Sequence, residues 1–272
     1  MSVSYLIASG KGGVGKSTLT ASLGRALAQS RSSVVIVDTD IGLRAQDALL
    51  GLENNVVYDL LDVQDGGCTL DQALLSVPGL PSLHLLPAAQ FARAKCLDFR
   101  LFRNVLLSLK QTHDFVLIDC PAGIERGLRN VLNAGTDESI LVVTPDDIAI
   151  RDAERVAGIL DAKKLSRPRL IVNRLQPKLI AAREMYSART IADLLDLPLL
   201  GEIPEDPAVL RALLRHASPL DFNCAFREAV LRIAGRLKGE LPPFPDFGSK
   251  PLPWYRRPFL KPMKEMIPID DH

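Results

Sequence analysis

Short, mostly apolar runs recur along the chain, and each is followed by a segment that contains helix-forming residues. Such runs are typical of strands buried on both faces of a parallel sheet. The pattern predicts strands at 3–8, 34–37, 83–87, 115–119, 139–143, 170–174 and 199–203. It predicts helices at 19–29, 44–51, 58–61, 70–75, 97–109, 148–160, 180–195, 209–214 and 222–237. This alternation indicates an α/β fold with one doubly wound, mostly parallel sheet.

The pattern changes after residue 240. From Leu241 onward prolines recur, and they break helices and favour extended chain. Residues 250–267 also interleave Trp254 and other apolar side chains with lysines and arginines. This mixture suits an anionic membrane surface as well as a proline-rich strap lying on the domain. We therefore assign residues 1–240 to one domain and residues 241–272 to a proline-rich, basic-aromatic tail whose role is open.

A glycine-rich segment, residues 9–18, lies between the first strand and the first long helix. Gly10, Gly15, Lys16 and Ser17 fit the phosphate-binding pattern G-x-x-x-x-G-K-[ST]. Glycines let successive backbone N–H groups turn inward, and a helix N-terminus adds positive potential. Lys16 is expected on the β- and γ-phosphates, and the Ser17 hydroxyl on Mg²⁺. The predicted phosphate cradle comprises Gly10, Gly12, Gly13, Val14, Gly15, Lys16, Ser17 and Thr18.

Lys11 is a second lysine at the mouth of this loop. An ordinary phosphate loop needs one lysine, at its end. The residues alone allow Lys11 to fold back on its own nucleotide or to reach a nucleotide held by a second copy of the chain.

Polar residues follow several of the predicted strands. Asp38 and Asp40 come after the second strand, on the same side if that strand continues, and Asp119 ends the fourth. Ligands bind at the carboxyl ends of strands in open α/β sheets, so these acids are expected to manage a metal ion and a water. Gly123 is expected to donate its N–H to a γ-phosphate. Asn173 and Arg174 end a later strand and suit a base edge and a stacked ring.

Composition excludes several classes of protein. The 272 residues are 47% hydrophobic, which supports a large core, and the net charge of +1 argues against a chain-wide field for nucleic acid. The 4 cysteines contain no C-x-x-C pair, so neither zinc nor redox chemistry is suggested. The first strand leaves no room for a signal peptide, and no apolar stretch approaches the roughly 20 residues of a membrane span. A cytoplasmic location is expected.

The loop Lys11–Ser17 resembles the deviant Walker A motif of the ParA/MinD ATPases. Residues 38–44 resemble switch I of the cell-division branch of that family, 119–125 its switch II, and 203–206 the loop near its adenine. The resemblance covers residues 3–238 and favours the cell-division branch over the partition ATPases.

The resemblance implies an ATP-dependent homodimer with ATP and Mg²⁺ held between subunits. Such a dimer binds the inner face of the cell membrane peripherally through its tail, regulates septum placement with a MinC-like inhibitor, and hydrolyses ATP when a MinE-like activator binds. It implies catalytic roles for Lys11, Lys16 and Asp40, metal roles for Ser17, Asp38 and Asp119, an adenine frame of Asn173, Arg174, Pro204 and Asp206, and a partner surface at Arg151 and Asp152.

Three positions depart from the family pattern. Ala45 stands where the family usually has asparagine, Ser17 replaces the commoner threonine, and Pro258 and Pro262 interrupt the tail. The tail is therefore not a clean amphipathic helix, because each proline removes a helix hydrogen bond.

Three other functions stay open at this point. A partition-type ATPase would bind DNA nonspecifically through basic residues such as Lys163, Lys164, Arg167 and Arg169, and another positioning ATPase of the same family is a further alternative. A metal-cluster carrier or reductase would need paired cysteines, and Cys96 and Cys120 form no known motif of that kind. A scaffold that only binds nucleotide would not need the three aspartates. With a function in the cell-division branch of the family, no specific nucleic acid is expected as a partner.

Overall fold

The protein, seen here in a computed structural model, is described over residues 2–91, 97–123, 126–162, 167–245 and 247. Its strands are β1 (Val3–Ala8), β2 (Val34–Asp38), β3 (Leu75–Val77), β4 (Leu80–Leu86), β5 (Phe115–Asp119), β6 (Glu138–Val143), β7 (Arg169–Leu175) and β8 (Leu199–Pro204). They form one sheet in the order β3-β4-β2-β5-β1-β6-β7-β8. Strand β3 pairs antiparallel with β4, and the other pairs are parallel. The predicted fold class is confirmed.

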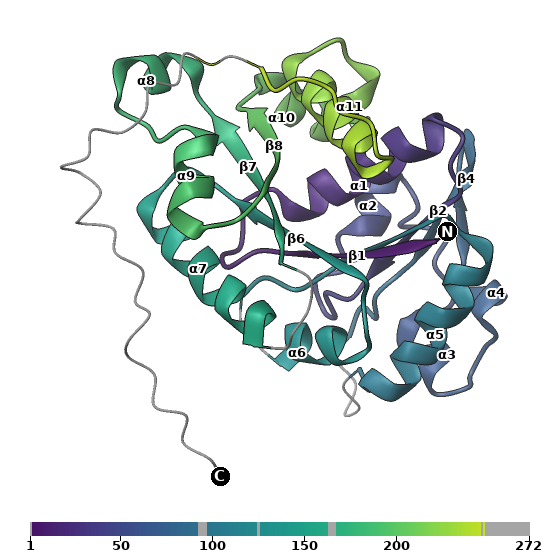
Figure 1. Cartoon of the computed structure of the whole chain (residues 1–272). Coiled ribbons are helices and arrows are strands. Elements are labelled where there is room, and N and C mark those ends of the chain that lie inside the picture. Colours follow the sequence, from purple (N-terminus) through teal and green to yellow (C-terminus); the bar gives the residue numbers. More distant parts are fainter. Residues whose placement is uncertain (1, 92–96, 124–125, 163–166, 246, 248–272) are drawn as a thin grey trace.

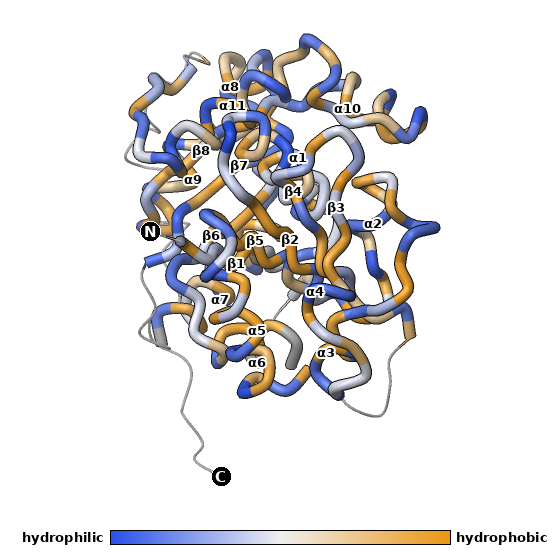
Figure 2. The backbone as a smooth tube through the Cα atoms, turned by 90° about the vertical axis from the view of Figure 1, so that its right-hand side faces the viewer, coloured by the Kyte–Doolittle hydropathy of each residue, from blue (hydrophilic) through white to orange (hydrophobic). Residues whose placement is uncertain are grey.

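Helices cover both faces of this sheet (Figure 1). They are α1 (Lys16–Gln29), α2 (Gln46–Leu50), α3 (Leu60–Gln64), α4 (Leu70–Ala73), α5 (Phe99–Thr112), α6 (Arg126–Asn133), α7 (Asp147–Ala162), α8 (Pro177–Ala182), α9 (Ala188–Leu195), α10 (Pro207–Leu213), the 3₁₀ turn η1 (Pro219–Asp221) and α11 (Ala225–Leu237). In β1, Leu6 and Ala8 enter the core under α5, α7 and α9, whereas Tyr5 and Ile7 enter the core under α1 and α11. Figure 2 shows the central strands as a hydrophobic layer.

Some elements differ from the prediction. The helix expected at 70–75 ends earlier, at Ala73. The chain then forms edge strand β3 (Leu75–Val77), turns at Gly79 (φ 76°) and pairs antiparallel with β4. The expected helix at 180–195 is two helices. Arg183 adopts a left-handed conformation that ends α8, and the Ser187 side chain accepts a hydrogen bond from Thr190 N that begins α9. Helix α6 was not predicted.

The first tail residues pack against the domain. Arg236 of α11 donates to the Pro242 carbonyl at 2.8 Å, and its guanidinium lies 3.7 Å from the centre of the Phe244 ring. Phe247 packs against the core. The basic-aromatic tail beyond it, 248–272, lies outside the described residues, as do Lys163, Lys164, Cys96 and Glu125. In the described part of the chain, no helix is long and apolar enough to cross a membrane.

Candidate nucleotide-binding site

The loop between β1 and α1 has the geometry of a phosphate cradle. Gly13 (φ 80°) and Gly15 (φ 91°) adopt conformations that disfavour any side chain. A Cβ on Gly15 would also lie 2.5 Å from Nδ2 of Asn173. The loop leads directly into the N-terminus of α1, a helix of 14 residues, which adds positive potential where anions bind.

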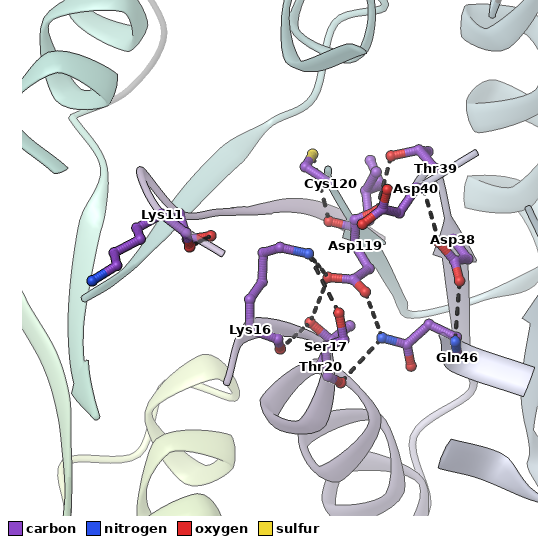
Figure 3. Close-up of polar contacts among 12 residues, drawn as sticks. Lys11, Lys16, Ser17, Thr20, Asp38, Thr39, Asp40, Gln46, Asp119 and Cys120 are labelled. Carbon is purple, nitrogen blue, oxygen red and sulfur yellow. Dashed lines mark hydrogen bonds and ion pairs between the residues drawn. The ribbon is translucent and has the colours of Figure 1, made fainter. Parts of the chain in front are cut away.

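Two carboxylates face this loop from neighbouring strands. Asp38 ends β2, Asp119 ends β5, and the two residues are paired in register and fully buried. Lys16 Nζ lies 2.6 Å from Oδ1 of Asp119 (Figure 3). Burial lowers the pKa of Lys16, but the charge and hydrogen bond of Asp119, together with smaller contributions from Cys120 and Asp40, raise it, and the net shift is upward.

Two buried carboxyl groups, those of Asp38 and Asp119, lie near one buried ammonium group, that of Lys16. Burial and then the charge of Asp119 raise the pKa of Asp38 to about 7. At that pKa Asp38 is only partly ionised near neutral pH, and a divalent cation beside it would favour the ionised form. Buried carboxylate oxygens beside a serine hydroxyl are the donors that Mg²⁺ prefers. The residues therefore fit the magnesium ion that the sequence predicts, with Ser17, Asp38 and Asp119 around it.

Gln46 connects these groups, and sequence analysis missed it. Its Nε2 donates to Oδ2 of Asp119 at 2.7 Å and to the Ser17 carbonyl at 3.1 Å, and its backbone N–H donates to Oδ2 of Asp38 at 3.1 Å. No motif includes a glutamine here. It opens a short helix after an irregular loop, so periodicity gives no signal for its burial.

Asp40 lies in the turn after β2. Asp38 and Asp40 would lie on the same side only if the strand continued through Asp40. Because β2 ends at Asp38, this expectation does not apply. The Asp40 N–H donates to Oδ1 of Asp38 at 2.9 Å. Partial burial raises the pKa of Asp40, and Asp119 adds to this while Lys16 opposes it. Thr39 donates from both its N–H and its hydroxyl to the Asp119 carbonyl, which ties this turn to β5.

Lys11 lies apart from the carboxylates. Figure 3 shows its side chain pointing away from Lys16 and Asp119. Its side chain is 47% exposed and its Nζ is 3.9 Å from Oδ1 of Asp146. An exposed ion pair of this length is weak. Lys11 is therefore held loosely and faces outward rather than into its own phosphate loop.

Gly123 lies against the phosphate loop in this structure. Its N–H donates to the Ser9 carbonyl at 3.0 Å, and its φ is 90°. A contact from this N–H to a γ-phosphate requires that hydrogen bond to break.

The four predicted adenine residues lie at the ends of adjacent strands β7 and β8. Asn173 supports the loop, since its Nδ2 donates to the Val14 carbonyl at 2.8 Å. Asp206 accepts hydrogen bonds from Ala208 N at 2.9 Å and Phe226 N at 3.3 Å, which occupy its carboxylate. Arg174 is exposed with φ 61°, and Pro204 is buried at the end of β8. The structure brings the four together, and their role at adenine stays a prediction.

Helix α7 touches the phosphate loop. A Cβ on Gly10 would lie 2.3 Å from the carbonyl carbon of Asp152, so the two backbones are in close contact. Arg151 is exposed beside it, and Asp152 is 3.4 Å from Arg155. The phosphate loop is therefore in direct contact with the helix that carries the predicted partner surface.

Residues invoked by the alternative functions are engaged elsewhere. Cys120 is a fully buried thiol whose pKa burial raises to about 12. Arg167 pairs with Asp196, and Arg169 pairs with Glu138 at 2.7 Å. Over the described ranges, no group of three or more histidine, cysteine or acidic residues is arranged to hold a metal ion.

Comparison with known proteins adds independent findings. The CobQ/CobB/MinD/ParA nucleotide binding domain family matches residues 5–220. The septum site-determining protein MinD of Synechocystis is 43% identical over 245 residues, covering 89% of this chain and 91% of that protein. A solved MinC:MinD cell division protein complex from Aquifex aeolicus superimposes with a TM-score of 0.84 at 37% identity, covering 90% and 99% of the two chains. Pyrococcus horikoshii MinD, solved with Mg-ADP, gives a TM-score of 0.75 at 30% identity, covering 87% and 96%.

Substitution of Lys16 tests the buried ion pair. Lys16→Met leaves the Asp119 charge buried without its cation, and we expect a loss of about 3 kcal/mol in the free energy of unfolding without nucleotide. The control is Lys110→Met, which breaks an ion pair of the same 2.6 Å length between side chains 25% and 37% exposed. It is expected to cost at most about 1 kcal/mol. Urea denaturation measures both values, and equal losses would contradict the role of burial.

Proposed function

The chain belongs to the MinD branch of the CobQ/CobB/MinD/ParA nucleotide-binding family, and we propose that it works as an ATP-dependent dimer on the membrane surface that places the division septum. It is an ATPase that uses ATP with Mg²⁺, and it functions in septum site determination. The observation that carries the proposed dimer is the outward orientation of Lys11 at the mouth of a complete phosphate cradle.

Lys16 moves during nucleotide binding. In this structure it is bound to Asp119 at 2.6 Å. Phosphate oxygens compete for the same ammonium group, so Lys16 exchanges the carboxylate for the β- and γ-phosphates. Mg²⁺, when bound, supplies positive charge to the phosphates, and Ser17, Asp38 and Asp119 are the residues that would hold it. The freed Asp119 is then available to this ion.

Catalysis rests on positioning rather than on a strong base. Asp40 is next to Asp119 and is the carboxylate that we assign to orienting the attacking water. Its N–H bond to Asp38 fixes the turn that carries it. Lys11 of the neighbouring copy would stabilise the charge that develops on the phosphates, as an arginine finger does. A site that lacks this second lysine hydrolyses ATP slowly.

Partner binding is proposed at α7. The structural relative from Aquifex aeolicus was solved with MinC, and a MinE-like activator is the other expected partner. The close contact between Gly10 and Asp152 links the phosphate loop to the helix that carries Arg151. Nucleotide state is thereby communicated to the partner surface.

Membrane binding is proposed for residues 248–272. The Arg236 contacts to Pro242 and Phe244 set the point at which the tail leaves the domain. Beyond it the sequence carries Trp254, Tyr255 and Phe259 among basic residues, a composition suited to an anionic interface. Dimerisation would double the number of tails and so raise the affinity for the membrane.

Lys11→Ala tests the dimer. We expect normal folding, because Lys11 is half-exposed and its contact with Asp146 is long, but loss of ATP-dependent dimerisation. Size-exclusion chromatography with light scattering, in ATP and in ADP, measures this. Lys238→Ala, at another exposed lysine, is the matched control and should dimerise normally. A Lys11→Ala chain that dimerises with ATP like the control would refute the proposal.

Co-sedimentation with anionic liposomes tests the tail. The full chain is compared with a chain that ends at Phe247, which keeps the Arg236–Phe244 contact. We expect the full chain to pellet with ATP but not with ADP, and the shortened chain to stay in solution. Equal pelleting of both chains would remove the tail from the mechanism. Salt-sensitive DNA binding without liposome binding would instead favour a partition function.

A further inference from the structure

Gln46 has a buried side chain that bridges three parts of the site. It is the first residue of α2 and is fully buried. Its Nε2 donates to Asp119 and to the Ser17 carbonyl, as Figure 3 shows. A carboxylate and a carbonyl only accept hydrogen bonds, so the amide nitrogen must face them. The orientation of the Gln46 amide is therefore determined by its partners.

Asp119 is held on both of its oxygens. Lys16 binds Oδ1 at 2.6 Å and Gln46 binds Oδ2 at 2.7 Å. When Lys16 turns to phosphate, Asp119 loses the first contact and keeps the second. Without Gln46, the released carboxylate would keep only a long hydrogen bond of 3.5 Å from the Thr20 hydroxyl to Oδ1, which would hold it weakly for a metal ion. Gln46 also fixes Asp119 relative to residue 17, whose hydroxyl is the expected metal ligand.

The other end of the amide is unsatisfied. Gln46 Oε1 is buried and has no hydrogen-bond partner in the described part of the chain. A buried acceptor without a donor is costly, and such an atom calls for an explanation, such as a functional role or a nearby water or ion. Magnesium ions in proteins keep several waters, which are strong donors. The orphan oxygen therefore fits the edge of a hydrated cation site.

We propose that Gln46 is a positioning residue of the magnesium site: its amide nitrogen holds Asp119 while Lys16 turns to the phosphates, and its amide oxygen faces the hydration shell of the ion. The inference rests on the metal site proposed above. Gln46 lies two residues after the segment 38–44 that resembles switch I and bonds to Asp38 within it, so a movement of that segment would also disturb the contact between Gln46 and Asp119.

Gln46→Met tests the role, since methionine has a similar length but cannot form these hydrogen bonds. Binding of a fluorescent ATP analogue is measured in EDTA and across a magnesium titration. We expect the affinity for the ATP analogue in EDTA to be unchanged. The magnesium concentration that gives half of the increase in affinity should rise about 10- to 100-fold, as for other groups that orient metal ligands. Gln46→Asn, which keeps the amide but is shorter, should shift in the same direction and serves if methionine prevents folding.

The matched control is Gln72→Leu. Gln72 is exposed and bonds within the capping box of α4, so its magnesium response should equal that of the unaltered chain. An unchanged magnesium response in both Gln46 variants would refute the role of Gln46, as would an equal loss of ATP binding in EDTA and in magnesium. If the unaltered chain itself binds ATP independently of magnesium, the proposed metal site fails instead.

Discussion

The buried carboxylate of Asp119 is the constraint on which the site depends. An ionised carboxylate without solvent is stable only if its oxygens are bound, and here Lys16 and Gln46 bind one oxygen each. Its register partner Asp38 adds a second buried acid, fixed by N–H groups from Asp40 and Gln46. The phosphate loop, the turn after β2 and the start of α2 are thus all positioned by the ends of two adjacent strands.

This arrangement explains why nucleotide and metal act together. Lys16 and Gln46 bind the two oxygens of Asp119. In the proposed mechanism a phosphate takes Lys16 away from Asp119, and the carboxylate would then be available to a divalent cation. Because Gly10 lies against α7, we propose that nucleotide binding also affects the proposed partner surface. Lys11 points away from Lys16 and Asp119, and it remains available to a second chain in the proposed dimer.

Much of the fold was predictable because buried parallel strands leave apolar runs and because glycines mark the phosphate loop. Gly13, Gly15, Lys16, Asp38 and Asp119 all lie where a strand–loop–helix order requires them. Edge strand β3 was missed because three residues give no usable period. Gln46 was missed because its importance comes from tertiary contacts to groups far apart in the sequence. The hydrogen bonds of Asn173 to Val14 and of Asp206 to Ala208 and Phe226 could not be predicted, because they also depend on the tertiary structure.

The central claim is that a working site contains Asp40 from one chain and Lys11 from another. Mixing a Lys11→Ala chain with an Asp40→Ala chain tests it most directly. In the mixed dimer one site combines an intact Asp40 with a Lys11 from the partner, so ATP hydrolysis should appear that neither chain shows alone. If Lys11 serves its own nucleotide, neither site of the mixed dimer is complete. A mixture that forms the mixed dimer, as light scattering would show, and is still as inactive as its components would contradict the account.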